Sequence, residues 1–201
     1  MATQPLVISL PQWLDGFLAE AGEVFGAAEE RMRLAVGLAR RNVEEATGGP
    51  FGAAVFEVAT GRLIAAGVNR VEACRCSAAH AEVVALSLAQ QARGHHDLSA
   101  GPACELVTSA EPCAMCLGAV HWSGVRRLLC GARDEDARAV GFDEGDKPPD
   151  WPAALGRRGV EVVRDCLRDE ARAVLAEYAR RGGAIYNPAR AGGSARDLDA
   201  K

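Results

Sequence analysis

Hydrophobic residues recur every three or four positions over residues 29–46, in the run EERMRLAVGLARRNVEEA. This spacing predicts an amphipathic helix, because it places Met32 and Val36 on one side, and the glycines of the following TGG sequence end it. Before this helix, residues 1–27 alternate short apolar pieces with prolines and glycines. That pattern predicts an N-terminal extension with one short helix near residues 12–21.

Apolar runs of strand length follow the helix. The runs FGAAVFEV and RLIAAGVN are separated by the turn-like ATG and predict a β-hairpin. Two further strands and two helices are then expected to alternate, at residues 79–92, 104–110, 112–124 and 126–132. Alternating strands and helices of these lengths predict an α/β fold in which helices cover a buried sheet.

The last third of the chain begins with a charged segment at residues 133–150, which we interpret as a loop. A strand-like run at residues 159–165 and an alanine-rich helix at residues 169–181 follow it. We therefore expect one domain over residues 28–188 and, because its residues are small and polar, a flexible C-terminal tail at residues 189–201.

Composition narrows the classes of function. Hydrophobic residues make up 49% of the 201 residues and charged residues 25%, which is typical of a globular domain. The net charge of −4 provides no basic field for nucleic acid, so a small-molecule substrate is expected. The sequence shows no apolar run of membrane-spanning length and no signal peptide, which predicts a cytoplasmic protein without a membrane partner. Seven cysteines without a secretion signal favour metal binding or packing over disulfides.

The candidate chemistry lies in two short motifs, HAE at residues 80–82 and PCAMC at residues 112–116, each at the start of a predicted helix. Cys113 and Cys116 project from one side of a helical turn, and His80 from a neighbouring helix can complete three corners of a tetrahedron. Three ligands leave the fourth position of a zinc ion open, as in catalytic sites. Glu82, two residues beyond the histidine, is placed to act as a general acid and base.

The order His-x-Glu and then Pro-Cys-x-x-Cys is the pattern of zinc deaminases that act on nucleobases. One alternative is a zinc-stabilised interaction module, whose ion has a fourth ligand such as Cys74, Cys76 or Cys130. A second is a self-contained cluster of Cys74, Cys76 and His80, although it would leave the Cys-x-x-Cys pair unexplained.

The segments GGPFGAAVF, GVNRV, AHAE, TSAEPCAMCLGAVHW and GFDEG occur in an order that resembles bacterial guanine deaminases of the cytidine deaminase-like superfamily. RCSAAHAE and LVTSAEPC also resemble the branch of that family that acts on the s-triazine ammeline. The resemblance implies a three-layer α/β fold with a mixed five-stranded sheet between helices. It also implies zinc-dependent conversion of guanine to xanthine and ammonia, and a homodimer that can exchange C-terminal segments.

The resemblance further implies that Phe51 stacks on the base, Asn69 hydrogen-bonds its ring and Glu144 relays a proton to the leaving amine. From the local pattern alone, Phe51 would be a core residue, Asn69 a turn residue and Glu144 one charge on an acidic loop. The remaining expected substrate contacts are Ala81, Asp143 and Tyr186. Rival enzymes with similar motifs are tRNA adenosine deaminases, whose polyanionic substrate does not suit this acidic chain, and cytosine or nucleoside deaminases.

Overall fold

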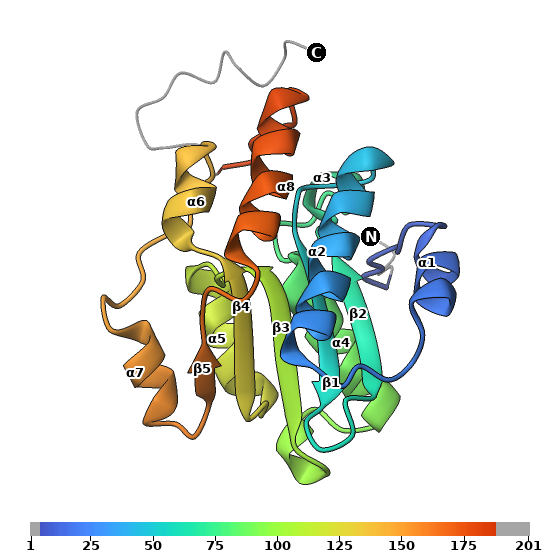
Figure 1. The fold of residues 1–201 in the computed structure, drawn as a ribbon, viewed down its shortest axis with the longest axis vertical. Helices are drawn as coiled ribbons and strands as arrows, with labels where there is room; N and C mark the ends of the chain where they lie inside the picture. Colours follow the sequence, from blue (N-terminus) through green and yellow to red (C-terminus); the bar gives the residue numbers. More distant parts are fainter. Residues whose placement is uncertain (1–4, 188–201) are drawn as a thin grey trace.

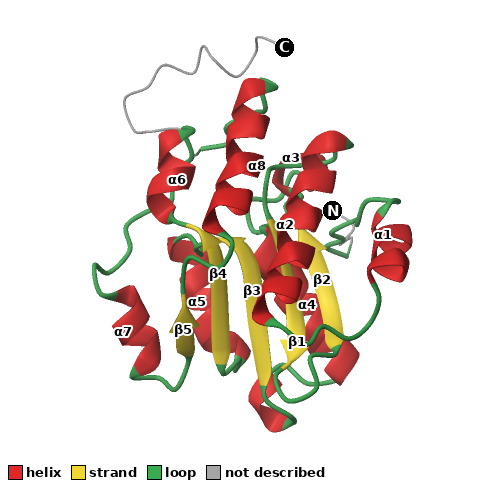
Figure 2. Ribbon diagram, viewed as in Figure 1, coloured by secondary structure: helices red, strands yellow, loops and turns green. Residues whose placement is uncertain are grey.

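The structure, a computed structural model, describes residues 5–187. The tail predicted at residues 189–201 lies outside the described residues. Within the described part, helices pack on both faces of a central sheet, as Figures 1 and 2 show. The three-layer arrangement expected from the sequence is therefore confirmed.

The sheet contains five strands in the order β2-β1-β3-β4-β5. The hairpin strands β1 (Gly52–Glu57) and β2 (Leu63–Val68) are antiparallel, and β1 also pairs antiparallel with β3 (Cys104–Ala110). β3 pairs in parallel with β4 (Arg127–Ala132), and β4 in parallel with the short β5 (Glu161–Val163). The mixed sheet and the predicted hairpin are both confirmed.

The two faces of the sheet carry different helices. One face is covered by α2 (Ala28–Glu44) and α8 (Arg168–Arg180), the other by α4 (Ala81–Arg93) and α5 (Ala114–Ser123). Successive strand residues point to opposite faces. Accordingly Phe56 packs with the α2 and α8 side chains, whereas its neighbour Val55 packs with those of α4. Both faces are apolar, which explains why all seven residues of β3 are buried.

The remaining helices are short. They are α1 (Leu14–Ala21), α3 (Val71–Cys74), the 3-10 turn η1 (Leu98–Ala100), α6 (Asp134–Ala139) and α7 (Trp151–Gly156). The helix α1 occupies the place predicted for it in the N-terminal extension. After it, Val24 bridges to Arg62, so this segment joins the end of the sheet beside β2. None of the helices within residues 5–187 is long and apolar enough to cross a membrane.

The interpretation of residues 133–150 as a loop was wrong for α6. This helix has no apolar periodicity, so the hydrophobic pattern does not reveal it. Polar contacts hold it instead: the Asp136 carboxylate accepts a hydrogen bond from the backbone nitrogen of Arg133 at 2.8 Å and another from Arg168 Nε at 2.8 Å. Acidic side chains in its first turn also suit the positive end of the helix dipole.

Candidate active site

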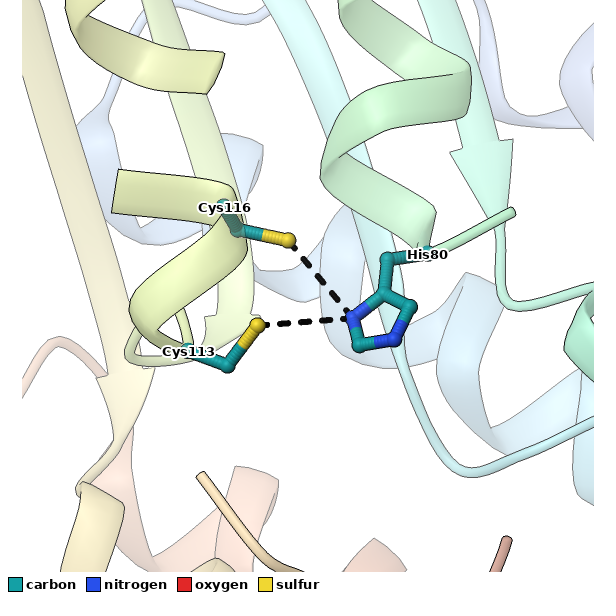
Figure 3. Close-up of side chains that lie close together, drawn as sticks. All are labelled: His80, Cys113 and Cys116. Atoms are coloured by element: carbon teal, nitrogen blue, oxygen red, sulfur yellow. Dashed lines mark hydrogen bonds between the residues drawn. The ribbon is translucent and has the colours of Figure 1, made fainter. Parts of the chain in front are cut away.

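His80 and Cys113 each stand directly before a helix. His80 is the N-cap of α4 and Cys113 the N-cap of α5, so both helices begin where the motifs predict. In Figure 3 the side chains of His80, Cys113 and Cys116 point toward one another from these two helix starts. The Nδ1 atom of His80 lies 3.6 Å from the sulfur of Cys113 and 3.6 Å from that of Cys116.

These separations fit a tetrahedral zinc ion. Zinc binds sulfur at about 2.3 Å and imidazole nitrogen at about 2.0–2.1 Å, so a nitrogen and a sulfur ligand at the tetrahedral angle stand about 3.6 Å apart. The three ligand atoms all lie within 4.8 Å of one another. The two thiols and the imidazole are also the donor types that zinc prefers.

In the described part of the chain, no fourth protein ligand lies near this group. Among residues 5–187, His80, Cys113 and Cys116 form the one cluster of His, Cys, Asp and Glu side chains close enough to hold an ion. Cys130 is buried in β4, and the thiol of Cys74 instead lies 3.5 Å from the Ser9 hydroxyl. The site therefore has the open form of a catalytic zinc centre rather than the closed form of a structural one.

The pKa values of the two thiols favour the binding of a cation. A hydrogen bond with Cys116, supported by one with His80, lowers the pKa of Cys113 to about 4. The same hydrogen bond raises the pKa of Cys116, because that thiol keeps the shared proton. A thiolate is thus present at neutral pH, and a bound divalent cation would replace the remaining proton.

Glu82 lies in the first turn of α4 and is only 6% exposed. Burial raises the pKa of its carboxyl group above the ordinary value, and the negative charge of Cys113 adds to this effect. A carboxyl group whose pKa moves toward neutrality can both accept and release a proton during a reaction. The location and the electrostatics therefore agree with the general acid and base role predicted from the motif.

A cavity of about 380 Å³ opens beside these residues. This volume suits a small organic ligand. Seven of the ten predicted site residues line it: Phe51, His80, Glu82, Cys113, Asp143, Glu144 and Tyr186. Cys116, Asn69 and Ala81 are buried and do not belong to the lining set. The structure thus gathers most of the predicted residues, from segments far apart in the sequence, around one space.

Asp143 and Glu144 differ in their surroundings, although both line the cavity. The Asp143 side chain is 28% exposed, and its carboxylate accepts a hydrogen bond from the backbone nitrogen of Gly145 at 2.9 Å. Glu144 is only 6% exposed, and burial raises its pKa to about 8, partly offset by the positive charge of Lys147. Glu144 can therefore carry a proton at neutral pH.

Aromatic rings form one wall of the cavity. Phe51 and Phe142 meet edge to face with ring centres 5.0 Å apart, and Tyr186 lies 5.3 Å from Phe142. Tyr186 reaches this wall within its own chain, because the Tyr178 hydroxyl donates a hydrogen bond to the backbone oxygen of Ala184 at 2.7 Å. The buried hydroxyl of Tyr186 has no hydrogen-bond partner among residues 5–187.

Asn69 follows β2 and is 1% exposed. Its side-chain oxygen accepts a hydrogen bond from the backbone nitrogen of Val71 at 3.2 Å, whereas its side-chain nitrogen has no partner in the described chain. Ala81, the first residue of α4, is fully buried, and its backbone oxygen lies close to Gly67 of β2. Asn69 therefore retains a side-chain donor for a ligand, without a partner among residues 5–187.

Sequence reasoning missed several lining residues. They are Val71, Ser77, Glu111, Ala114, Met115, Phe142, Gly145 and Asn187. Phe142 and Glu111 fall inside the GFDEG and TSAEPC segments, so those motifs did contain a signal for them. The Glu111 carboxylate is already engaged, accepting hydrogen bonds from Arg164 Nε at 2.5 Å and the backbone nitrogen of Asp134 at 3.1 Å. We assign it to the support of the cavity wall.

Comparisons with known proteins agree with this geometry. The family model for the cytidine and deoxycytidylate deaminase zinc-binding region matches residues 26–132. A solved guanine deaminase from Nitrosomonas europaea is 54% identical, with a TM-score of 0.83 over 90% of this chain and 99% of that one. The guanine deaminase of Bacillus subtilis (strain 168) is 40% identical over 126 residues, which are 60% of this chain and 78% of the relative. The chain belongs to the guanine deaminase family.

Guanine deaminases are hydrolytic, and zinc is the cofactor that the His-Cys-Cys site of this member holds. A further similar structure shows a protein bound to 2,6-diaminopurine. It is 55% identical to this chain, with a TM-score of 0.83 and coverage of 91% of this chain and 97% of that one. Membership of the guanine deaminase family also excludes the zinc-stabilised interaction module as the class of this protein.

Proposed function

We propose that this protein hydrolyses guanine to xanthine and ammonia in the cavity beside His80, Cys113 and Cys116. The observation that carries the proposal is the buried carboxyl group of Glu82 next to a three-ligand zinc site, in a cavity of about 380 Å³. A relative 55% identical to this chain binds 2,6-diaminopurine, which, like guanine, carries an amino group at C2.

The cavity walls provide contacts for a flat base. We propose that the ring of Phe51 packs against the face of the purine, because aromatic rings stack favourably on nucleobases. The unpaired side-chain nitrogen of Asn69 would donate to an acceptor on the purine edge, where guanine presents O6 and N7. The buried hydroxyl of Tyr186 offers a further polar contact.

Zinc held by the three ligands supplies a Lewis acid that makes a water molecule more acidic. Glu82 accepts the proton of the attacking water and delivers it to N3 of the base, so C2 becomes tetrahedral. Proton transfers of this kind by a positioned side chain contribute about 10²–10⁴-fold to a rate. The raised pKa of Glu82 suits this exchange, because the carboxyl group must hold the proton briefly.

Glu144 protonates the departing amine. With a pKa of about 8, its carboxyl group is mostly protonated at neutral pH and can donate to the amino group as the C–N bond breaks. Asp143 is exposed, and its carboxylate is engaged by the backbone of the turn, so we assign it no proton transfer. The C2 hydroxyl releases its proton to solvent as it becomes a carbonyl, Glu144 regains a proton from solvent, and the products are ammonia and xanthine.

Three other substrate classes are less well supported than guanine. A tRNA would need positive charge around the cavity, and the net charge of −4 does not supply it. Ammeline presents an amino carbon between two ring nitrogens, so it could undergo the same step as guanine, and we propose it as a second substrate. Cytosine is smaller than the purine that the 55% identical relative binds, and cytidine, which carries a ribose, has a different shape.

We also propose a homodimer built on α5. This helix exposes Met115 by 42% and Trp122 by 79%. The two residues are seven positions apart and therefore lie on one face of the helix. A second copy of the chain would cover this face around a twofold axis. Exchange of C-terminal segments is not required, because Tyr186 already lines the cavity of its own chain.

Ammonia release from the purified zinc-loaded protein tests the proposed reaction. Guanine, ammeline, adenine, cytosine and cytidine are supplied in parallel. We expect guanine to be deaminated with the highest kcat/KM and xanthine to form in equal amount. Ammonia released from cytidine or adenine but not from guanine would overturn the assignment.

A further inference from the structure

The N-terminal segment contacts the backbone that carries the proposed substrate contacts. The Nε atom of Arg70 donates a hydrogen bond to the backbone oxygen of Ser9 at 2.9 Å, and Arg70 directly follows Asn69 in the chain. Four residues after Ser9, the indole Nε1 of Trp13 donates to the hydroxyl of Thr47 at 3.0 Å. The extension is thus joined to two loops at the same end of the hairpin.

The bond from Trp13 continues into a buried chain of hydrogen bonds. The Thr47 hydroxyl donates to Oδ1 of Asn42 at 2.7 Å. The side-chain nitrogen of Asn42 then donates to the backbone oxygen of Gly49 at 2.8 Å and to that of Asn69 at 3.0 Å. Asn42 is fully buried in α2, and it holds together the loop entering β1 and the loop leaving β2.

The donors and acceptors in this chain have only one consistent order. An indole N–H can only donate, so the Thr47 hydroxyl uses its own hydrogen on Asn42 Oδ1. That bond orients the Asn42 amide with its NH₂ group toward the two backbone carbonyls. Hydrogen bonds in such a chain polarise and strengthen one another, so the first donor affects the last bond.

The loop that enters β1 and the loop that leaves β2 are closely packed, so neither can shift without meeting its neighbours. A Cβ atom at Gly48 would lie 2.0 Å from the backbone oxygen of Asn69, and one at Gly49 would lie 2.4 Å from the Tyr186 hydroxyl. The backbone nitrogen of Asn69 also donates to the backbone oxygen of Phe51 at 3.0 Å. A shift of the Gly48–Phe51 loop would therefore move the aromatic wall and the Asn69 amide relative to each other.

We propose that Asn42 is a positioning residue for the base, and that the N-terminal segment at residues 9–13 braces it through Trp13 and Thr47. This inference rests on the proposed function, because it takes Phe51 and Asn69 to be the contacts with the purine. The network sets the separation between the Phe51 ring and the Asn69 amide. It does not touch the carboxyl groups that move protons, so it governs binding rather than the chemical step.

The test compares Trp13→Phe and Thr47→Val with the wild-type, full-length, zinc-loaded protein. Trp13→Phe keeps an aromatic ring beside Phe17 but removes the N–H donor, and Thr47→Val keeps the side-chain volume but removes the hydroxyl. We expect each variant to raise the KM for guanine about 3- to 10-fold, as for the loss of one hydrogen bond, with kcat within twofold. The KM of the double variant should equal that of Thr47→Val alone, because both substitutions interrupt the same series of hydrogen bonds.

Phe25→Leu is the matched control. Phe25 also precedes α2, but its ring packs on Phe56 with ring centres 5.5 Å apart and not on Trp13, so its replacement should lower Tm and leave KM unchanged. An equal rise in KM for this control, or unchanged KM in both test variants, would overturn the positioning role. If the wild-type protein does not deaminate guanine, the proposed function fails instead. The dissociation constant of guanine, measured by calorimetry in the same variants, then decides the positioning role separately.

Discussion

The ammonium group of Lys147 donates a hydrogen bond to the backbone oxygen of Pro112 at 3.1 Å. Pro112 immediately precedes the zinc ligand Cys113, and Lys147 lies three residues after Glu144 in the same loop. A second hydrogen bond joins the same segments: the backbone nitrogen of Ala114 donates to the backbone oxygen of Glu144 at 2.9 Å. The metal ligands and the proposed proton donor are therefore held in one rigid unit.

Lys147→Met should loosen this unit. The Lys147 side chain is only 7% exposed and also pairs with Asp134, so the variant loses a buried, charged hydrogen-bond donor but keeps the apolar stem. We expect a loss of about 1–3 kcal/mol in the free energy of unfolding, measured by urea denaturation, together with a lower kcat. Arg157→Met, at an exposed ion pair with Asp150, is the matched control and should change neither quantity. Equal stability of the two variants would contradict this role.

Glu82→Gln should greatly slow turnover without releasing the metal. The substitution preserves the size of the side chain but removes the group that transfers the proton, so kcat should fall about 10²–10⁴-fold. Zinc content, measured by atomic absorption, should remain that of the wild-type protein, because His80, Cys113 and Cys116 are intact. Glu72→Gln, at an exposed position, is the control and should keep full activity. A Glu82→Gln protein that lacks zinc would show that this carboxylate acts on the metal site instead.

Glu144→Gln and Asp143→Asn distinguish the two adjacent carboxyl groups. Only the first removes a buried, protonated group, so kcat for guanine should fall by about tenfold or more in Glu144→Gln and by less than threefold in Asp143→Asn. Steady-state kinetics of both variants at pH 7 provide the measurement. The reverse order of effects would assign the proton transfer to Asp143.

Trp122→Glu should convert the proposed dimer into a monomer. Trp122 is 79% exposed, so a charge there costs the isolated chain little, whereas it would be buried between two copies. Light scattering after size-exclusion chromatography measures the mass. Arg126→Glu, a charge change at another exposed position, should leave the mass unchanged. A wild-type protein that elutes as a monomer at micromolar concentration would rule out this interface.

The sequence predicted the elements that are apolar and periodic, and the motifs that carry chemistry. The residues from Cys104 to Ala110 form β3 as expected, and His80 and Cys113 begin their helices as expected. It did not predict α6, because that helix is held by ion pairs such as Asp136–Arg168 across 32 positions of chain. It also did not place Phe142 on the cavity wall, although this residue falls inside the GFDEG segment, because hydrophobicity alone does not distinguish a core phenylalanine from a lining one.

The bond network of α6 makes stability depend on pH in a predictable direction. Hydrogen bonds from Arg168 to Asp136 lower the pKa of this carboxyl group in the folded protein. The folded state therefore binds fewer protons than the unfolded state, and the stabilisation is present above the unfolded pKa of about 3.9 and is lost as pH falls through the folded value.

Asp136→Asn should consequently cost about 1–3 kcal/mol at pH 7, and progressively less below about pH 4. Urea denaturation of the wild type and the variant, in the same buffers at a series of pH values, gives this difference, and effects of the zinc ligands cancel in it. Asp169→Asn is the control, because the Asp169 side chain is 92% exposed and its pair with Arg172 should contribute little at any pH. If the cost of Asp136→Asn stays constant from pH 7 to pH 3, the bonds that hold α6 do not depend on the ionised carboxylate, and the helix owes its place to packing instead.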